Sequence, residues 1–109
     1  MDEHDFRKKS DAALEALKRR LLELGDLHGF EVEGSGDKLE LLFEEPEEAR
    51  FVISPNSAVR QIWISALTTS FKLDWSEQTQ SFVLGKTGEP LPQLMGRILT
   101  QQLGKPISL

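Results

Sequence analysis

The sequence predicts an α+β fold, a two-layer α/β sandwich in which an N-terminal and a C-terminal helix pack on one face of an antiparallel sheet of about six strands. Two observations predict this arrangement. Apolar residues recur at helical spacing near both ends of the 109-residue chain, and they alternate with polar residues in the short segments between. Both helices can cover the same sheet face, so the other face is expected to stay open. The length fits a single domain, residues 1–109.

The two helices are expected at the ends of the chain. The first runs from about Glu3 to Leu24, where Gly25 offers a natural stop. The second begins at Pro90 and ends before Gly104. We interpret their apolar stripes as core, comprising Phe6, Ala13, Leu14, Leu17, Leu21 and Leu24, then Leu91, Leu94, Met95, Ile98, Leu99 and Leu103. The tail 105–109 ends in apolar residues and is expected to lie back across the helices.

Between the helices the apolar period changes from 3.6 to 2. Apolar residues at 30 and 32, a Gly34–Asp37 turn, and apolar residues at 39, 41 and 43 predict a hairpin. Four more strand candidates, separated by turn-forming residues, continue an antiparallel meander: Arg50–Ile53, Gln61–Ser65, Phe71–Trp75 and Ser81–Leu84.

The stretch Gln61–Ser65 is the most informative part of the chain. Alternation there places Ile62 and Ile64 on one side of a strand and Trp63 on the other. If the helices cover the isoleucine side, Trp63 stands on the open face as an available aromatic surface. Exposed aromatic residues of this kind often mark binding surfaces.

Composition excludes several classes of function. The chain has no cysteine and only two histidines, which removes disulfides, thiolate chemistry and histidine-rich metal sites. A net charge of −5 argues against nucleic-acid binding. No segment has the pattern of a secretory signal or a membrane span, so a cytoplasmic protein is expected. No motif places a nucleophile beside a histidine, so no catalytic residue is assigned and no enzyme is expected.

The order of elements, the sequence QIWIS at Gln61–Ser65, the Asp74-Trp75 pair and the Gly88 turn before the last helix closely resemble the frataxin family, in particular its bacterial members. The resemblance extends over essentially the whole chain. It implies a small iron-binding protein that docks on the cysteine desulfurase and the iron–sulfur cluster scaffold protein. Such a protein serves as an iron donor, or iron chaperone, or as a regulator of sulfur transfer. We expect a monomer, with metal-driven oligomers as a further option.

Five residues are assigned to partner binding, four of them by the resemblance. Trp63 matches the family's strand tryptophan and Gln61 its glutamine. Arg60 stands at a position that is often basic or histidine, and Asn56 at a polar loop position that contacts the scaffold. Ser65 flanks Trp63 on the same predicted face.

Trp75 matches the family's second tryptophan, and we interpret it as a partly buried packing residue. Phe82 stands where the family usually has tryptophan, and the loop Ser54–Ala58 departs from the family's pattern.

In this family, iron is held weakly by an acidic ridge on the first helix and first strand. Ferrous and ferric ions accept hard oxygen ligands, so neighbouring carboxylates with water can bind them. Residues 2–24 carry six acidic and six basic residues, whereas residues 26–48 carry nine acidic residues and Lys38 alone, so the negative charge lies toward the hairpin. Arg19, one turn after Glu15, would compete for that ligand. The candidate iron ligands are Glu3, His4, Asp11, Glu15, Asp26, Glu31 and Glu33.

Two alternatives stay open. The first is ferroxidase or iron-storage activity at the carboxylate edge, although the chain lacks the helix-borne Glu-x-x-His pattern of di-iron proteins. The second is a metal-independent interaction module, as in small acidic α/β secretion chaperones, which also present an open sheet and normally dimerise.

Overall fold

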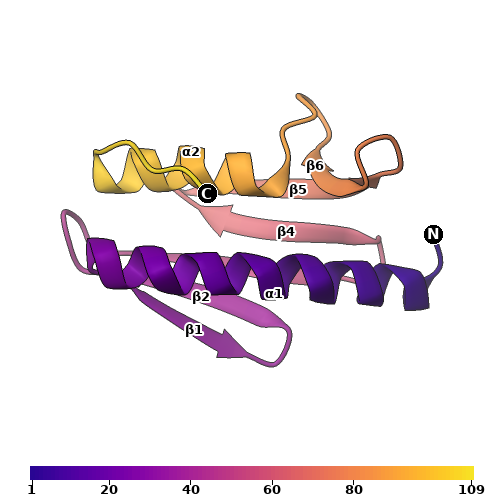
Figure 1. Ribbon diagram of the computed structural model, residues 1–109, viewed down its shortest axis with the longest axis horizontal. Helices are drawn as coiled ribbons and strands as arrows, with labels where there is room; N and C mark the ends of the chain where they lie inside the picture. Colours follow the sequence, from indigo (N-terminus) through magenta and orange to yellow (C-terminus); the bar gives the residue numbers. More distant parts are fainter.

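The computed structural model describes residues 1–109 and has the two predicted layers. Helices α1 (Glu3–His28) and α2 (Leu91–Leu103) lie on one face of a six-stranded antiparallel sheet (Figure 1). The strands pair in chain order, which confirms the predicted meander and fold class. Neither helix has the length and apolar character needed to cross a membrane. The strands are β1 (Glu31–Ser35), β2 (Lys38–Phe43), β3 (Ala49–Asn56), β4 (Gln61–Ala66), β5 (Thr69–Ser76) and β6 (Ser81–Leu84).

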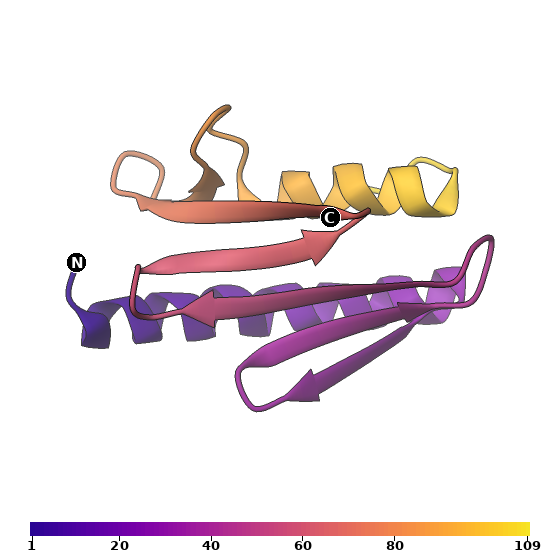
Figure 2. The same ribbon diagram turned by 180° about the vertical axis from the view of Figure 1, so that it is seen from behind.

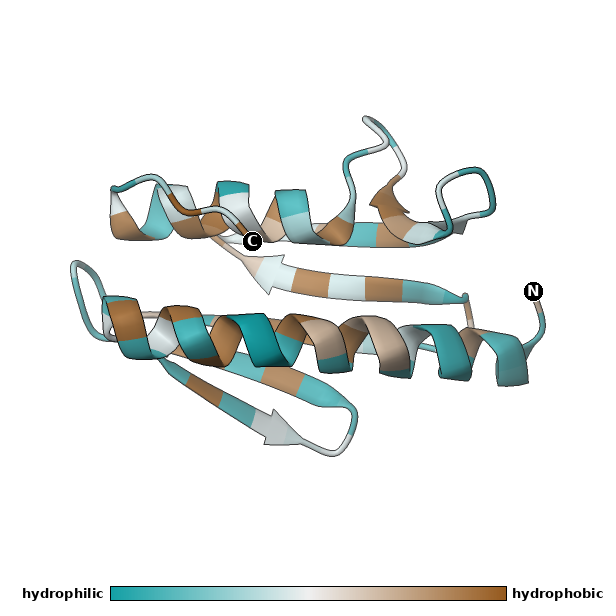
Figure 3. Ribbon diagram, in the orientation of Figure 1, coloured by the Kyte–Doolittle hydropathy of each residue, from teal (hydrophilic) through white to brown (hydrophobic).

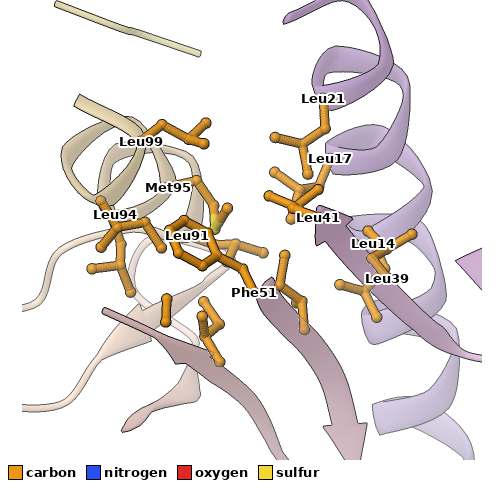
Figure 4. Packing of buried hydrophobic residues seen from close by; sticks show 14 of the residues in the cluster. Leu14, Leu17, Leu21, Leu39, Leu41, Phe51, Leu91, Leu94, Met95 and Leu99 are labelled. Atoms are coloured by element: carbon orange, nitrogen blue, oxygen red, sulfur yellow. The ribbon is translucent and has the colours of Figure 1, made fainter. Parts of the chain in front are cut away.

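The core fills the space between the helices and one face of the sheet. Hydropathy alternates along β4 (Figure 3), and the strongly apolar Ile62, Ile64 and Ala66 are the buried positions. Leucines of α1 and α2 meet above Phe51, which is fully buried (Figure 4). Each such side chain contributes about 2 kcal/mol when it leaves water. Burial of this one sheet face therefore holds the two layers together.

The first helix runs one turn further than its sequence predicts. Gly25 does not end α1: it is buried inside the helix, and Gly29, with φ of 80°, is the C-cap. The amides of Gly29 and Phe30 both donate to the Gly25 carbonyl, at 2.8 and 3.1 Å. A Cβ at residue 25 would lie 2.6 Å from the Phe30 carbonyl oxygen. Glycine is required at 25 because the chain passes this point closely after leaving the helix.

The C-terminal tail lies across the helices, as expected, and its end lies between them in Figure 1. Ile107 is buried, and its amide donates to the Thr100 hydroxyl at 2.9 Å. From the other helix, Arg20 Nη2 donates to the Ser108 carbonyl at 3.2 Å. The tail thus connects α2 to α1.

Gly25→Ala is expected to lower the free energy of unfolding by about 2 kcal/mol, because the added methyl group forces the Phe30 carbonyl away from the helix. Urea unfolding measures the change. The matched control is Gly85→Ala, at an exposed turn where a Cβ would meet its nearest neighbour at an ordinary 3.7 Å. Equal stability losses in the two variants would contradict this explanation of Gly25.

Candidate functional site

The second face of the sheet carries no helix, as the view from behind shows (Figure 2). Trp63 is 37% exposed there, and it is the only aromatic residue among the large exposed apolar side chains. Ile62 and Ile64, its neighbours on β4, are buried on the covered face, which confirms the predicted alternation. We call this surface the open face. By strand register, its residues around Trp63 are Val52, Ser54, Asn56, Gln61, Ser65, Ser70, Lys72 and Asp74.

Neighbouring side chains hold the Trp63 ring in one orientation. Its indole Nε1–H donates to Gln61 Oε1 at 2.8 Å, and Gln61 Nε2 donates to Asp74 Oδ1 at 3.1 Å. Because the Asp74 carboxylate accepts from the Gln61 amide nitrogen, the Gln61 amide oxygen is directed toward the indole. Lys72 Nζ lies 4.8 Å from the ring centroid. A partner would therefore meet an aromatic surface that is already ordered, which lowers the entropy lost on binding.

Farther along the open face, a charged pair joins β2 and β3. Arg50 binds Glu40 through two hydrogen bonds, of 2.9 and 3.1 Å. These hydrogen bonds to Glu40, together with its charge, raise the pKa of Arg50. Glu33 of β1 lies directly across from Glu40 in the strand register. The open face therefore becomes more acidic from β4 toward β1.

The remaining predicted partner residues shape the edge of this surface. Asn56 accepts a hydrogen bond from the Ala58 amide at 3.2 Å, inside the turn between β3 and β4. Arg60 has a positive φ of 56°, and its guanidinium donates to the Ser57 carbonyl. Ser65 is exposed beside Trp63. Gln61, Trp63 and Ser65 thus form the surface, while Asn56 and Arg60 set the conformation of the adjoining turn.

Trp75 lies on the covered side of the sheet and packs edge-on against Phe82, with ring centroids 5.1 Å apart. It is half-buried, in line with its interpretation as a packing residue. The smaller Phe82 is fully enclosed, so the phenylalanine at this position belongs to the core.

Carboxylates gather in one hollow between α1 and the β1–β2 hairpin, with a volume of about 270 Å³. Asp11 and Glu15 of α1 line it together with Asp37 of the hairpin turn. We call it the carboxylate hollow. Lys18 and Lys38 also line it, and these two cations reduce its attraction for a metal ion. Sequence reasoning missed Asp37 because its approach to α1 depends on how the hairpin packs.

The other predicted iron ligands lie outside the hollow. Among them, Glu3 is paired with Arg7 at 3.2 Å. Inside the hollow, Glu15 is paired with Arg19 at 3.5 Å, as the sequence indicated. No three histidine, aspartate or glutamate side chains come together closely enough to hold a metal ion by themselves. Ligands that water must complete give weak binding. The remaining candidates are spread over the first turn of α1, its last turn and strand β1: His4, Asp26, Glu31 and Glu33.

Comparison with known proteins defines the class. A family model described as a frataxin-like domain matches residues 1–105. The iron-sulfur cluster assembly protein CyaY of Stutzerimonas stutzeri is 29% identical over 77 residues, which cover 71% of this chain and 68% of that protein. The protein of the same name from Pseudomonas entomophila is 26% identical over 107 residues, covering 98% and 94%.

The solved structures agree on the fold. Frataxin from Psychromonas ingrahamii superposes with a TM-score of 0.75 at 15% identity, covering 99% of this chain and 97% of that one. Two helices on one face of a six-stranded meander, with the other face open, define a frataxin-type α/β sandwich. The chain belongs to the frataxin-like family.

Gln61→Leu is expected to release the Trp63 ring, because it removes the acceptor of the indole N–H. The solvent exchange of that proton should become about fivefold faster, which corresponds to one hydrogen bond of about 1 kcal/mol. Proton NMR resolves the two indole signals, and the Trp75 signal serves as an internal reference. Gln78→Leu, in an exposed turn, is the matched control. An unchanged Trp63 exchange rate would show that Gln61 does not hold the ring.

Proposed function

We propose that this chain is a binding protein of iron–sulfur cluster assembly that docks on the cysteine desulfurase–scaffold complex through its open face. One observation carries the proposal: the exposed Trp63 ring, held by Gln61, Asp74 and Lys72 on a face without helices. Support also comes from the relatives, which are named as iron-sulfur cluster assembly proteins. Docked there, the chain delivers iron or regulates sulfur transfer.

The proposed contact has the composition of a binding hot spot. Tryptophan and arginine dominate such sites, and a central aromatic side chain commonly accounts for 2 kcal/mol or more. Around Trp63 the open face offers small hydroxyl groups, one ammonium and one carboxylate, from Ser54, Ser65, Lys72 and Asp74. A partner therefore needs a flat apolar contact for the ring and polar groups around it.

Iron is cargo in this proposal, held weakly at the carboxylate hollow. Asp11, Glu15 and Asp37 supply the hard oxygen atoms that ferrous and ferric ions prefer. The hollow opens to solvent and includes two lysines, so water must complete the coordination shell. Weak binding suits a donor, because a donor must release its ion to another site.

Docking without metal is the second candidate function. It is favoured by Lys18 and Lys38 in the carboxylate hollow and by the pairing of Glu15 with Arg19. Under this alternative, the open face regulates the complex and the acidic residues keep the surface soluble.

Trp63→Ala is expected to weaken binding to the desulfurase–scaffold complex by at least about thirtyfold, which corresponds to a hot-spot loss of about 2 kcal/mol. The free energy of unfolding should change by less than about 1 kcal/mol, because the ring contributes a cation–π contact and one exposed hydrogen bond but no core packing. Surface plasmon resonance measures the affinity. Leu27→Ala is the matched control, since it removes an exposed apolar side chain from α1. Equal affinities for the two variants would refute the assigned role of Trp63.

Anaerobic calorimetry with ferrous ion is expected to show weak binding. The double variant Asp11→Asn, Asp37→Asn should lower the affinity for ferrous ion by about tenfold. Lys18→Gln should raise the affinity, because it removes a cation from the hollow. Glu77→Gln, in the exposed turn between β5 and β6, is the control. Absence of any ferrous binding at millimolar concentration would leave docking without metal as the function.

A further inference from the structure

A second cavity lies on the helix side of the molecule, away from both surfaces described above. It is a groove of about 590 Å³ between α1, the start of α2 and strand β6. We call it the interhelix groove. Leu17, Phe82 and Leu91 line it, and all three belong to the buried core. Its volume is in the range typical of small-molecule sites.

The groove exists because α1 has small residues at this level. Ala12, Ala13 and Ala16 line it from the helix. Alanine leaves space that larger side chains would fill, and the tail residue Leu109 reaches the groove without filling it. The lining is therefore mainly apolar, with Gln80 and Ser81 as its uncharged polar members.

The charged side chains at the groove all have one sign. None of the chain's 18 acidic residues lines it, whereas Lys9 and Arg20 both do. Arg20 is already engaged, because its guanidinium binds Glu23 at 2.9 Å and the Ser108 carbonyl at 3.2 Å. Lys9 takes part in none of the five ion pairs of the structure. Its ammonium lies 5.2 Å from the centroid of the Trp75 ring, which also lines the groove.

The groove is long and has a free cation near one end. Lys9 and Arg20 are three turns apart on α1, about 16 Å along the helix axis. A linear apolar chain matches that length, and an anionic end group matches the unpaired ammonium. In a chain with a net charge of −5, a groove whose only charged side chains are cationic favours a ligand that is both acidic and apolar.

We propose that the interhelix groove binds a small amphiphilic carboxylate of the fatty-acid type, with its carboxylate at Lys9 and its acyl chain along Ala12, Ala13 and Ala16. The ligand's acyl chain covers Leu17 and Phe82, and its carboxylate gains a charge-assisted hydrogen bond from the Lys9 ammonium. This site is on the opposite side of the sheet from Trp63, so it is a function separate from docking.

The test uses decanoate below its micelle concentration as the probe. Calorimetry on the unaltered chain should show saturable binding of one decanoate. In the variant Trp63→Phe the only tryptophan left is Trp75, so its fluorescence should change along the same binding curve. Decyltrimethylammonium, with the same chain length and the opposite charge, should bind at least about tenfold more weakly. Absence of saturable decanoate binding, or equal binding of the two probes, would overturn the proposal.

Two variants locate the site. Lys9→Gln should weaken decanoate binding by about tenfold, as expected for a hydrogen bond between charged groups, whereas Lys8→Gln, outside the groove, should not. Ala16→Leu should fill the groove and abolish binding, whereas Gln101→Leu, at an exposed position of α2, should leave it unchanged. Binding that survives Ala16→Leu in a folded protein would place the probe elsewhere and refute the assignment. Failure of these tests leaves the docking proposal standing, because docking is measured at Trp63.

Discussion

The structure depends on the burial of one face of a single sheet under two helices. This burial determines the strand register, because a slip of one residue in β4 would turn Trp63 inward and expose Ile62 and Ile64. Both isoleucines are buried against the helices, and each contributes about 2 kcal/mol. The tryptophan ring is therefore held outside by the packing of its neighbours, although it is the largest apolar side chain of the strand. Its exposure follows from the core and needs no separate stabilising contact.

The same constraint separates stability from recognition. The covered face supplies the core, so residues of the open face are free to form a polar arrangement that serves binding. Gln61 and Asp74 are directly paired across β4 and β5, so backbone hydrogen bonds set the distance between their side chains. Sites built on paired strands are positioned more accurately than sites on loops. The hydrogen bonds from Trp63 to Gln61 and from Gln61 to Asp74 thus have a rigid base, whereas Asn56 and Arg60 act from a turn.

Periodicity was enough to predict the two helices, the six strands and the side on which Trp63 stands, since these depend only on spacing along the chain. The partners of Trp63 were harder to predict. Asp74 faces Gln61 only because β4 and β5 are joined by the two-residue turn Leu67-Thr68, where both residues have positive φ. Such turns normally carry Asn-Gly or Asp-Gly, so the sequence has no signal for this register. The end of the first helix was wrongly predicted at Gly25 for a related reason. Glycine commonly ends helices, but here it leaves room for the Phe30 carbonyl, which is a tertiary contact.

Strand β5 is the element that the open face and the interhelix groove share. Its side chains alternate, so Lys72 and Asp74 support Trp63 on one side while Trp75 lines the groove on the other. No side chain belongs to both sites. Coupling between them would require a shift of the β5 backbone, which is paired with β4 from Thr69 to Asp74 and with β6 from Leu73 to Ser76. Packed sheets of this kind do not deform continuously. A ligand in the groove should therefore change docking at Trp63 by only a few tenths of a kcal/mol, as for independent sites without shared partners.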